Sequence, residues 1–483
     1  MKKYEHILAG VTLFLCITGL IPLMLLGRYN HPTGDDYFYG VETHHIWEET
    51  HNLLPALQEA AKGVAEQYEI WQGTYSAMFL MYLPPNSFGD TAYHLFTVVI
   101  LLLLSGGIFY LSHQIFRGFL KASHYTWLTI ASLVSMLCIQ TIPFPEESFY
   151  WYNGAMYYTG FFAVSLFYFG LMCKYIRDGK KTQIVVLCLL AFFLAGGNYV
   201  SFLPTLLLTL AAIGISILCK KKKQQVIGLS MVSFAALIGF CISAMAPGNQ
   251  LRQSGMGKIP PTHAIAKALI QGTHFLAAWT SLWCIIAFLL MAPLLWRLYE
   301  HSSFRFPYPL VVIGFAYGIL CSSTCPTYYT MNLIGPARAV AIMYYMFHLF
   351  LFTVYAYGLG YLHRIVKEKG TGSVHSKALG IGISAAIGLC LLLQLFQGSF
   401  GECTAARAIR CLSTGEAAAY EQEYQNRLAL LLDDSLKEVE LTPYEHRADM
   451  LYVGDLSNDK TTPTNVRVAE FFHKISIWVN WDS

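Results

Sequence analysis

Long apolar segments recur along most of the chain and are separated by shorter polar ones. Runs of about 18 to 25 mainly apolar residues match the thickness of a bilayer when they form helices. We therefore predict an all-α polytopic bundle of about eleven transmembrane helices, over residues 7–26, 92–114, 124–142, 156–174, 182–198, 200–218, 226–245, 273–296, 307–325, 339–362 and 378–397. A transmembrane domain is expected over residues 1–397.

The segment 27–90, between the first two predicted spans, has a different pattern. Apolar residues recur at helical spacing from Leu53 to Tyr68, with charged residues between them. This spacing predicts an amphipathic helix on the membrane surface. Residues 70–83 are too few to span the bilayer and precede Pro84-Pro85, so we expect a second interfacial or re-entrant helix there.

From residue 398 the composition is that of an ordinary globular segment. A helix is expected at Glu416–Leu432 and another at 466–475, with short strands at 439–441 and 450–453. These elements predict a small extracytoplasmic α+β domain over residues 398–483, which gains stability by docking on the membrane domain.

Composition supports the membrane assignment. Of the 483 residues, 55% are hydrophobic and 13% charged, with a mean hydropathy of +0.45, whereas about a quarter of the residues of soluble proteins are charged. The net charge of +3 gives no reason to expect nucleic acid as a partner. The expected surroundings are a lipid bilayer.

The distribution of basic residues predicts which side each loop occupies. Lys and Arg accumulate on the cytoplasmic side of membrane proteins. With the N-terminus inside, eighteen basic residues fall in or beside inner loops, and six fall in outer loops: Arg28, Lys62, Arg252, Lys258, Lys267 and Arg338. We therefore expect a cytoplasmic N-terminus, an extracytoplasmic C-terminal domain, and segment 27–90 on the outer face.

The acidic pair Asp35-Asp36 directly follows the first predicted span. Acidic residues are scarce in this chain, so a pair at the outer boundary is a candidate catalytic site, with a weak preference for Asp36 as the base. Two neighbouring carboxylates raise the pKa of one of them, which suits a base near neutral pH. The structural alternative is a helix cap or a turn.

A second acidic pair lies in the next outer loop, among aromatic residues. Glu146, Glu147, Tyr150 and Trp151 form a pattern that suits sugar recognition, because aromatic faces stack on sugar rings and carboxylates accept hydroxyl protons. The alternative is an interfacial aromatic belt. Asn198, in the short turn 196–199, is a further sugar- or acceptor-binding candidate, and ordinary turn chemistry is its alternative.

Three cations break the rule that outer loops avoid basic residues. Arg252 follows Ala246-Pro247-Gly248-Asn249, Lys258 lies in the same loop, and Arg338 follows Gly335-Pro336. The guanidinium group matches phosphate oxygens, so these residues are candidate ligands of a lipid phosphate. The alternative for each alone is an ion-paired or snorkelling surface residue.

A divalent cation is a further hypothesis. His31, His44, His45 and His51 surround Asp35 and Asp36 in sequence, and imidazole and carboxylate are common metal ligands. Their spacing fits no standard metal motif, and solvated loop histidines are the alternative. No cofactor is therefore assigned.

Several short motifs together resemble a poorly characterised family of bacterial multi-pass membrane proteins related to the GT-C glycosyltransferases. They are Asp35-Asp36-Tyr37, Trp71-Gln72-Gly73, Ala246-Pro247-Gly248-Asn249 with Arg252, Gly454-Asp455-Leu456, and Asn465-Val466-Arg467-Val468-Ala469. Thr74 stands where the family often has Arg. The resemblance implies a GT-C-like fold, a polyprenyl-phosphate-linked sugar donor, and Asp35 and Asp36 as the acidic motif of the first outer loop.

The expected function is transfer of a sugar from such a donor to a glycan or glycolipid acceptor of the cell envelope, at the outer face of the bacterial cytoplasmic membrane. The alternatives are a transporter or flippase of a lipid-linked saccharide, and a polymerase or ligase of lipid-linked glycans. Transporters usually place charged residues near the membrane midplane, whereas the acidic pairs here lie at the predicted outer boundary.

Overall fold

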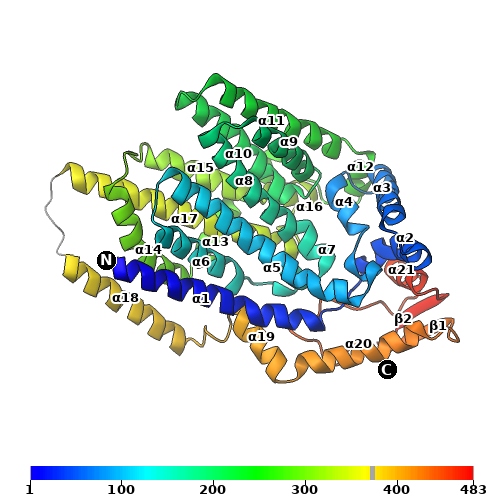
Figure 1. Ribbon diagram of the computed structural model, residues 1–483. Coiled ribbons are helices and arrows are strands. Elements are labelled where there is room, and N and C mark those ends of the chain that lie inside the picture. Colours follow the sequence, from blue (N-terminus) through cyan, green and yellow to red (C-terminus); the bar gives the residue numbers. More distant parts are fainter. Residues whose placement is uncertain (1, 370–375, 482–483) are drawn as a thin grey trace.

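The computed structural model describes residues 2–369 and 376–481, without the side chains of Lys2 and of residues 376–381. Helices dominate, and one end of the helical bundle is covered by short helices and a two-stranded sheet (Figure 1). The elements are α1 (Lys2–Leu26), α2 (Asp35–Thr50), α3 (Leu53–Ile70), α4 (Tyr75–Met81), α5 (Asp90–Ser112), α6 (His124–Gln140), α7 (Tyr152–Ala155), α8 (Phe161–Asp178), α9 (Lys181–Ala195), α10 (Tyr199–Leu218), α11 (Lys223–Ala244), α12 (Pro247–Ser254), α13 (Pro261–Trp279), α14 (Leu282–Glu300), α15 (Pro309–Ser322), α16 (Cys325–Met331), α17 (Ala337–Glu368), α18 (Ser376–Phe396), α19 (Thr404–Ser413), α20 (Glu416–Leu432), β1 (Glu438–Leu441), α21 (Pro463–Phe471) and β2 (Ser476–Val479).

Within the described residues, eight helical segments are long and apolar enough to cross a membrane: Lys3–Tyr29, Asp90–Phe119, Tyr152–Asp178, Tyr199–Leu218, Lys223–Ala244, Leu282–Glu300, Pro309–Met331 and Ala337–Glu368. The chain is thus a helical multi-pass membrane protein. Three of the eleven predicted spans correspond to helices outside this set: α6 has 17 residues, and α9 and the Gly382–Phe396 part of α18 are shorter apolar helices.

The predicted span 273–296 is not one helix. Its first residues end α13, and α14 begins at Leu282. Thr280 and Ser281 between them have extended backbone, and the Thr280 hydroxyl bonds to the Leu276 carbonyl. Ser and Thr side chains that bond to nearby backbone compete with helical hydrogen bonds, which accounts for the break in a continuous apolar run.

Two apolar cores hold the bundle together. The larger core includes residues of α1, α5, α6, α8, α14, α15 and α17, and the smaller one joins α8 to α9, α10 and α11. Glycine allows close approach at the turn between α9 and α10, where a Cβ at Gly197 would lie 2.2 Å from the Phe161 ring. Packing of apolar side chains between the helices fixes the positions of the helices, and with them the positions of the polar groups at the helix ends.

Segment 27–90 lies at one end of the bundle and forms α2, α3, α4 and two short 3₁₀ turns (Figure 1). The amphipathic helix expected from Leu53 to Tyr68 is α3, which buries Ala56, Ala60 and Gly63. The second expected helix is only α4, followed by the 3₁₀ turn Pro85–Phe88.

The C-terminal segment packs against the same end of the bundle. Helix α20 matches its predicted bounds, and β1 pairs in parallel with β2, with Val439 opposite Ile477. The predicted strand at 450–453 is wrong, because these residues pass through a turn whose Met450 and Leu451 are buried in the larger core. Burial at a turn, and not sheet pairing, explains their apolar character.

Helix α2 belongs to segment 27–90 and also packs against the C-terminal segment. Its Tyr37 and Val41 form one apolar cluster with residues of β1, α21 and β2. On α21, Arg467 donates to both carboxylate oxygens of Glu42, at 2.7 Å each, and to the Phe38 carbonyl at 3.1 Å. The C-terminal segment therefore fixes the position of the helix that begins with Asp35.

Candidate functional site

Asp36 is buried at the start of α2. Gly34 precedes the helix with a positive φ of 43°. The Asp36 carboxylate accepts hydrogen bonds from the Tyr93 hydroxyl at 2.6 Å, the Thr33 N–H at 3.1 Å and the Asn153 N–H at 3.0 Å. Burial raises the pKa of Asp36 to about 7, although the three donors favour the ionised form. Asp36 thus links α2 to α5 and α7.

Asp35 has a different environment. Its side chain is partly exposed, and among the described residues no hydrogen bond or ion pair engages its carboxylate. Burial raises the pKa of Asp35, and the positive charge of Arg338 opposes that rise. Its oxygen lone pairs are therefore available to accept a proton.

Arg338 is the second residue of α17 and lies beside the second acidic pair. Its Nη1 and its backbone N–H donate to Glu147 Oε2, at 3.0 and 3.1 Å. Its guanidinium group lies over the Trp151 ring, 4.8 Å from the ring centre. The Trp151 indole N–H and the Asn153 side-chain amide are buried without a hydrogen-bond partner among the described residues. Such groups are rarely left unpaired, so these donors are available to a ligand.

Arg252, on α12, is held by the Trp71-Gln72-Gly73 motif. Its Nη1 donates to Gln72 Oε1 at 2.5 Å, and its guanidinium group lies 4.6 Å from the Trp71 ring centre. The Gly73 N–H donates to Asn249 Oδ1 at 3.1 Å. Two motifs that lie far apart in sequence are therefore one structural unit that positions Arg252.

Two tyrosines connect these groups. The Tyr39 phenol is within electrostatic range of Asp35 and Arg252, and burial raises its pKa. The Tyr158 phenol is within electrostatic range of both Arg252 and Arg338. We call Asp35, Arg252, Arg338, Tyr39 and Tyr158 the Asp35 site. It brings together one unpaired carboxylate and two guanidinium groups from three separate parts of the chain.

Four other candidates lie elsewhere or have structural contacts. Burial raises the pKa of Glu146 to about 7, and its charged neighbours are Arg407 and Asp449 of the C-terminal segment as well as Glu147. Tyr150 is fully buried and donates to the Leu23 carbonyl at 3.1 Å. Asn198 caps α10 through the Ser201 N–H. Lys258 is exposed over the Tyr329 ring, and no described contact joins it to the Asp35 site.

The histidines do not form a metal site with Asp35 and Asp36. His31 is buried, its Nε2 lies 2.9 Å from Glu421 Oε2, and its ring stacks on Tyr424. Within the described residues, the potential ligand atoms of three or more such side chains come within 4.8 Å of one another in two groups: His45, Glu48 and His473, and Glu423, Glu445 and His446. Neither group includes either aspartate.

Sequence reasoning missed Tyr39, Tyr93, Asn153 and Tyr158. Tyr93 and Asn153 hold Asp36 from positions that are distant in sequence. Tyr93 is the second residue of the predicted span 92–114, and Asn153 lies in the aromatic loop before the span 156–174; many residues at a membrane interface occupy such positions.

The bundle contains two cavities of note. The larger, about 740 Å³, runs between α5, α8, α10, α15 and α17, and no charged residue lines it. Its lining includes Phe162, one helical turn beyond Tyr158, and Ser201, one turn beyond Asn198. The lining therefore begins one helical turn from Tyr158 along the chain and continues through the apolar bundle.

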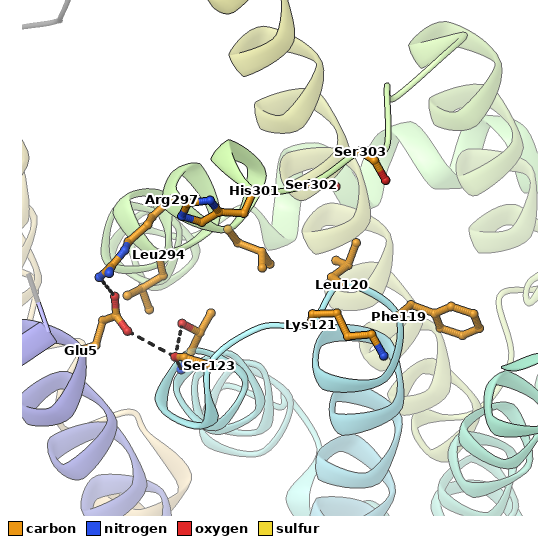
Figure 2. Close-up of a pocket in the computed structure, with 12 residues that line it drawn as sticks. Glu5, Phe119, Leu120, Lys121, Ser123, Leu294, Arg297, His301, Ser302 and Ser303 are labelled. Atoms are coloured by element: carbon orange, nitrogen blue, oxygen red, sulfur yellow. Dashed lines mark hydrogen bonds and ion pairs between the residues drawn. The ribbon is translucent and has the colours of Figure 1, made fainter. Parts of the chain in front are cut away.

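The smaller cavity, about 330 Å³, is lined by the start of α1 and the end of α14, away from the Asp35 site. Figure 2 shows Glu5 joined to both Arg297 and Ser123 there. Phe119 and Leu120 line both cavities. Glu5 and Arg297 form an ion pair, so the Glu5 carboxylate at this end of the bundle is already paired, unlike that of Asp35.

In comparisons with known proteins, no family model matches the chain and no curated protein matches it.

Proposed function

We propose that this protein is a membrane glycosyltransferase that moves a sugar from a polyprenyl-phosphate-linked donor to a cell-envelope glycan acceptor. The observation that carries the proposal is the Asp35 site, where an unpaired, partly buried carboxylate lies within electrostatic range of Arg338. The carboxylate provides the negative charge of a base, and the guanidinium group provides the positive charge that stabilises a departing phosphate. The resemblance of the sequence motifs to GT-C-related proteins supports the same conclusion.

In the proposed reaction, Asp35 accepts the proton of the acceptor hydroxyl as the acceptor oxygen bonds to the anomeric carbon of the sugar. The bond between that carbon and the phosphate oxygen breaks, and its electron pair remains on the departing lipid phosphate. Arg252 and Arg338 stabilise the negative charge that develops there. The pKa of Asp35, raised by burial, brings the base closer to neutral pH, where general-base catalysis is most effective.

The apolar cavity supports a lipid-linked donor. A volume of about 740 Å³ with no charged lining residue suits a hydrocarbon chain. The same lining is unsuited to carrying a hydroxyl-rich saccharide through the bundle, because its hydroxyl groups would lose their hydrogen bonds to water. This observation favours transfer at the Asp35 site over transport. We place that site at the outer face of a bacterial cytoplasmic membrane, following the distribution of basic residues.

A direct test supplies the purified protein, in lipid nanodiscs, with a panel of polyprenyl-phosphate-linked hexoses and pentoses and a glycolipid acceptor fraction. Release of free polyprenyl phosphate is the readout. We expect release from at least one donor, dependent on Asp35. Longer lipid-linked oligosaccharides in the panel distinguish a polymerase or ligase from a single-sugar transferase. Movement of an intact donor across sealed vesicles without release would contradict the proposal and favour the transporter alternative.

A further inference from the structure

The second half of α2 faces the turn that follows α21, and side chains with metal-ligating atoms meet there. The potential ligand atoms of His45, Glu48 and His473 all lie within 4.8 Å of one another. The His45 and His473 rings are stacked, with centres 4.3 Å apart. His473 Nε2 lies 3.2 Å from Glu48 Oε2. Three side chains from two distant segments therefore converge on a small volume.

The hydrogen bonds of the imidazoles leave lone pairs in this region. His45 Nε2 lies 3.1 Å from the Glu470 carbonyl, which only accepts, so Nε2 carries the proton and a neutral ring has its lone pair on Nδ1. The neighbouring His44 has the complementary arrangement, with Nδ1 at 3.3 Å from the Ser87 carbonyl and Nε2 at 3.4 Å from Glu48. Binding of one ring nitrogen to a backbone carbonyl is the usual support of a metal-ligating histidine.

The backbone holds the three groups in place without a ligand. His45 and Glu48 lie one turn apart on the same face of α2. His473 has a positive φ of 55°, and its N–H and that of Lys474 bond to the carbonyls of Glu470 and Ala469. Stacking of His44 on Phe471, 3.9 Å between ring centres, fixes α21 on α2. The cluster is therefore part of a rigid junction between two helices.

We propose that His45, Glu48 and His473 bind a divalent cation of the zinc type, with water completing its coordination. Two imidazole nitrogens and one carboxylate oxygen are a ligand set that Zn²⁺ favours, at about 2.0–2.2 Å from the ion. The bound cation fastens α21, and with it the C-terminal segment, to the helix that begins with Asp35. This proposal does not rest on the proposed transferase activity.

The second cluster of the described residues provides an internal control. Glu423, Glu445 and His446 also lie close together, but they offer one imidazole, and His446 Nδ1 already bonds to Glu423 at 2.5 Å. The proposed site has a similar contact between His473 and Glu48, so its second imidazole, His45, is the feature that distinguishes it. His446→Ala therefore removes a surface histidine without touching the proposed site.

The test uses full-length protein in detergent, purified without a polyhistidine tag and stripped with a chelator. Zn²⁺ is titrated in competition with a chromogenic chelator. Loss of an outer-shell group alone weakens metal binding by about 10–100-fold, so His45→Gln and His473→Asn should each weaken it by roughly 100-fold or more. Asn is chosen because it tolerates positive φ. His446→Ala should retain wild-type affinity.

A second readout checks that the site joins the two helices. Zn²⁺ should raise the unfolding temperature of the wild type and of His446→Ala, and leave that of His473→Asn unchanged. The proposal is overturned if the wild-type protein binds no Zn²⁺, if His45→Gln and His473→Asn bind it as the wild type does, or if His446→Ala alone loses it.

Discussion

Asp35 and Asp36 are adjacent in sequence, yet their carboxyl groups have opposite surroundings. Asp36 is fully buried and accepts three hydrogen bonds, whereas Asp35 is partly exposed and has no described hydrogen-bond partner. The sequence suggested two roles for the pair, one in catalysis and one at the start of a helix. Their different surroundings suit Asp36 to the role at the helix start and Asp35 to the catalytic role. We assign Asp36 to positioning of α2 and propose Asp35 as the base, in place of the weak sequence-based preference for Asp36.

Asp36→Asn should affect stability and its dependence on pH. The amide NH₂ would face an N–H or O–H donor, which costs about 1–3 kcal/mol of unfolding free energy. Because burial raises the folded-state pKa to about 7, above the usual value of about 3.9, the folded protein holds this proton more tightly than the unfolded chain. The unfolding free energy should therefore fall as pH rises from about 4 to about 7.

This pH dependence is measured by denaturant unfolding in detergent across that range. Glu146 contributes with the same sign, so the slope should be reduced in Asp36→Asn and not abolished. An unchanged slope and unchanged stability in Asp36→Asn would show that the buried hydrogen-bond network is not formed as described.

The two arginines of the Asp35 site should contribute to donor binding, and Lys258 should not. Arg252→Gln or Arg338→Gln removes a charged hydrogen-bond donor, which should weaken binding of polyprenyl phosphate by about 1.5–3 kcal/mol. Lys258→Gln is the matched control, because Lys258 is exposed over Tyr329. Affinity is measured by native mass spectrometry with polyprenyl phosphate. Equal effects of all three changes would indicate general electrostatic attraction of the phosphate and not a specific phosphate-binding site.

Sequence reasoning found the charged members of the site because ionisable residues are conspicuous at the ends of apolar spans. Asp35, Arg252 and Arg338 stand out for this reason. It assigned Tyr150 and Asn198 to ligand binding, whereas their hydrogen bonds are structural. The outcome for these two depends on which way a side chain points once the helices pack, and a linear pattern of aromatic and polar residues does not contain that information.

At the scale of elements, the unit formed by residues 71–74 and α12 holds Arg252 by close backbone contact. A Cβ at Gly73 would lie 2.0 Å from the Ser243 carbonyl oxygen and 2.6 Å from the Ala246 Cβ. Gly248 is equally close to Trp71, since a Cβ there would lie 2.3 Å from the Trp71 nitrogen. Only glycine fits at these two positions.

Gly73→Ala should therefore separate α12 from the Trp71 segment. Overpacking of this kind costs about 1–3 kcal/mol of unfolding free energy, and the displacement of Gln72 and Arg252 should also weaken donor binding. Gly214→Ala is the control, because a Cβ at this helical glycine meets no atom within 4 Å. Unfolding temperatures of both variants provide the measurement. A Gly73→Ala protein as stable as Gly214→Ala would contradict the packing described here.

Element prediction succeeded where periodicity is strong and failed at breaks. The expected helices at Leu53–Tyr68 and Glu416–Leu432 formed because apolar residues recur at helical spacing over several turns. The break at Thr280 and the turn at Met450 were missed because hydropathy is insensitive to side-chain bonds with the backbone and to burial of turns. The partner of β1 was also missed, since β2 lies beyond α21.

At the scale of the whole molecule, α2, which begins with Asp35, lies where the helical bundle meets the C-terminal segment (Figure 1). The orientation of the chain in the membrane is predicted from the distribution of its basic residues, which indicates that this end of the bundle faces outward. A cysteine at Asn458, an exposed position next to Ser457, should react with an impermeant thiol reagent in intact cells. A cysteine at Lys221, in the exposed turn between α10 and α11, should react only after lysis. The reverse labelling pattern would place the Asp35 site in the cytoplasm.

The central claim is that Asp35 is the base of a sugar transfer. The most direct measurement is the rate of polyprenyl phosphate release by purified Asp35→Asn with the donor that the wild type uses. Asn preserves size and hydrogen bonding but cannot accept the proton, so the rate should fall by roughly 10² to 10⁴, while the unfolding temperature and donor affinity stay near wild-type values. Release by Asp35→Asn at the wild-type rate would contradict the account.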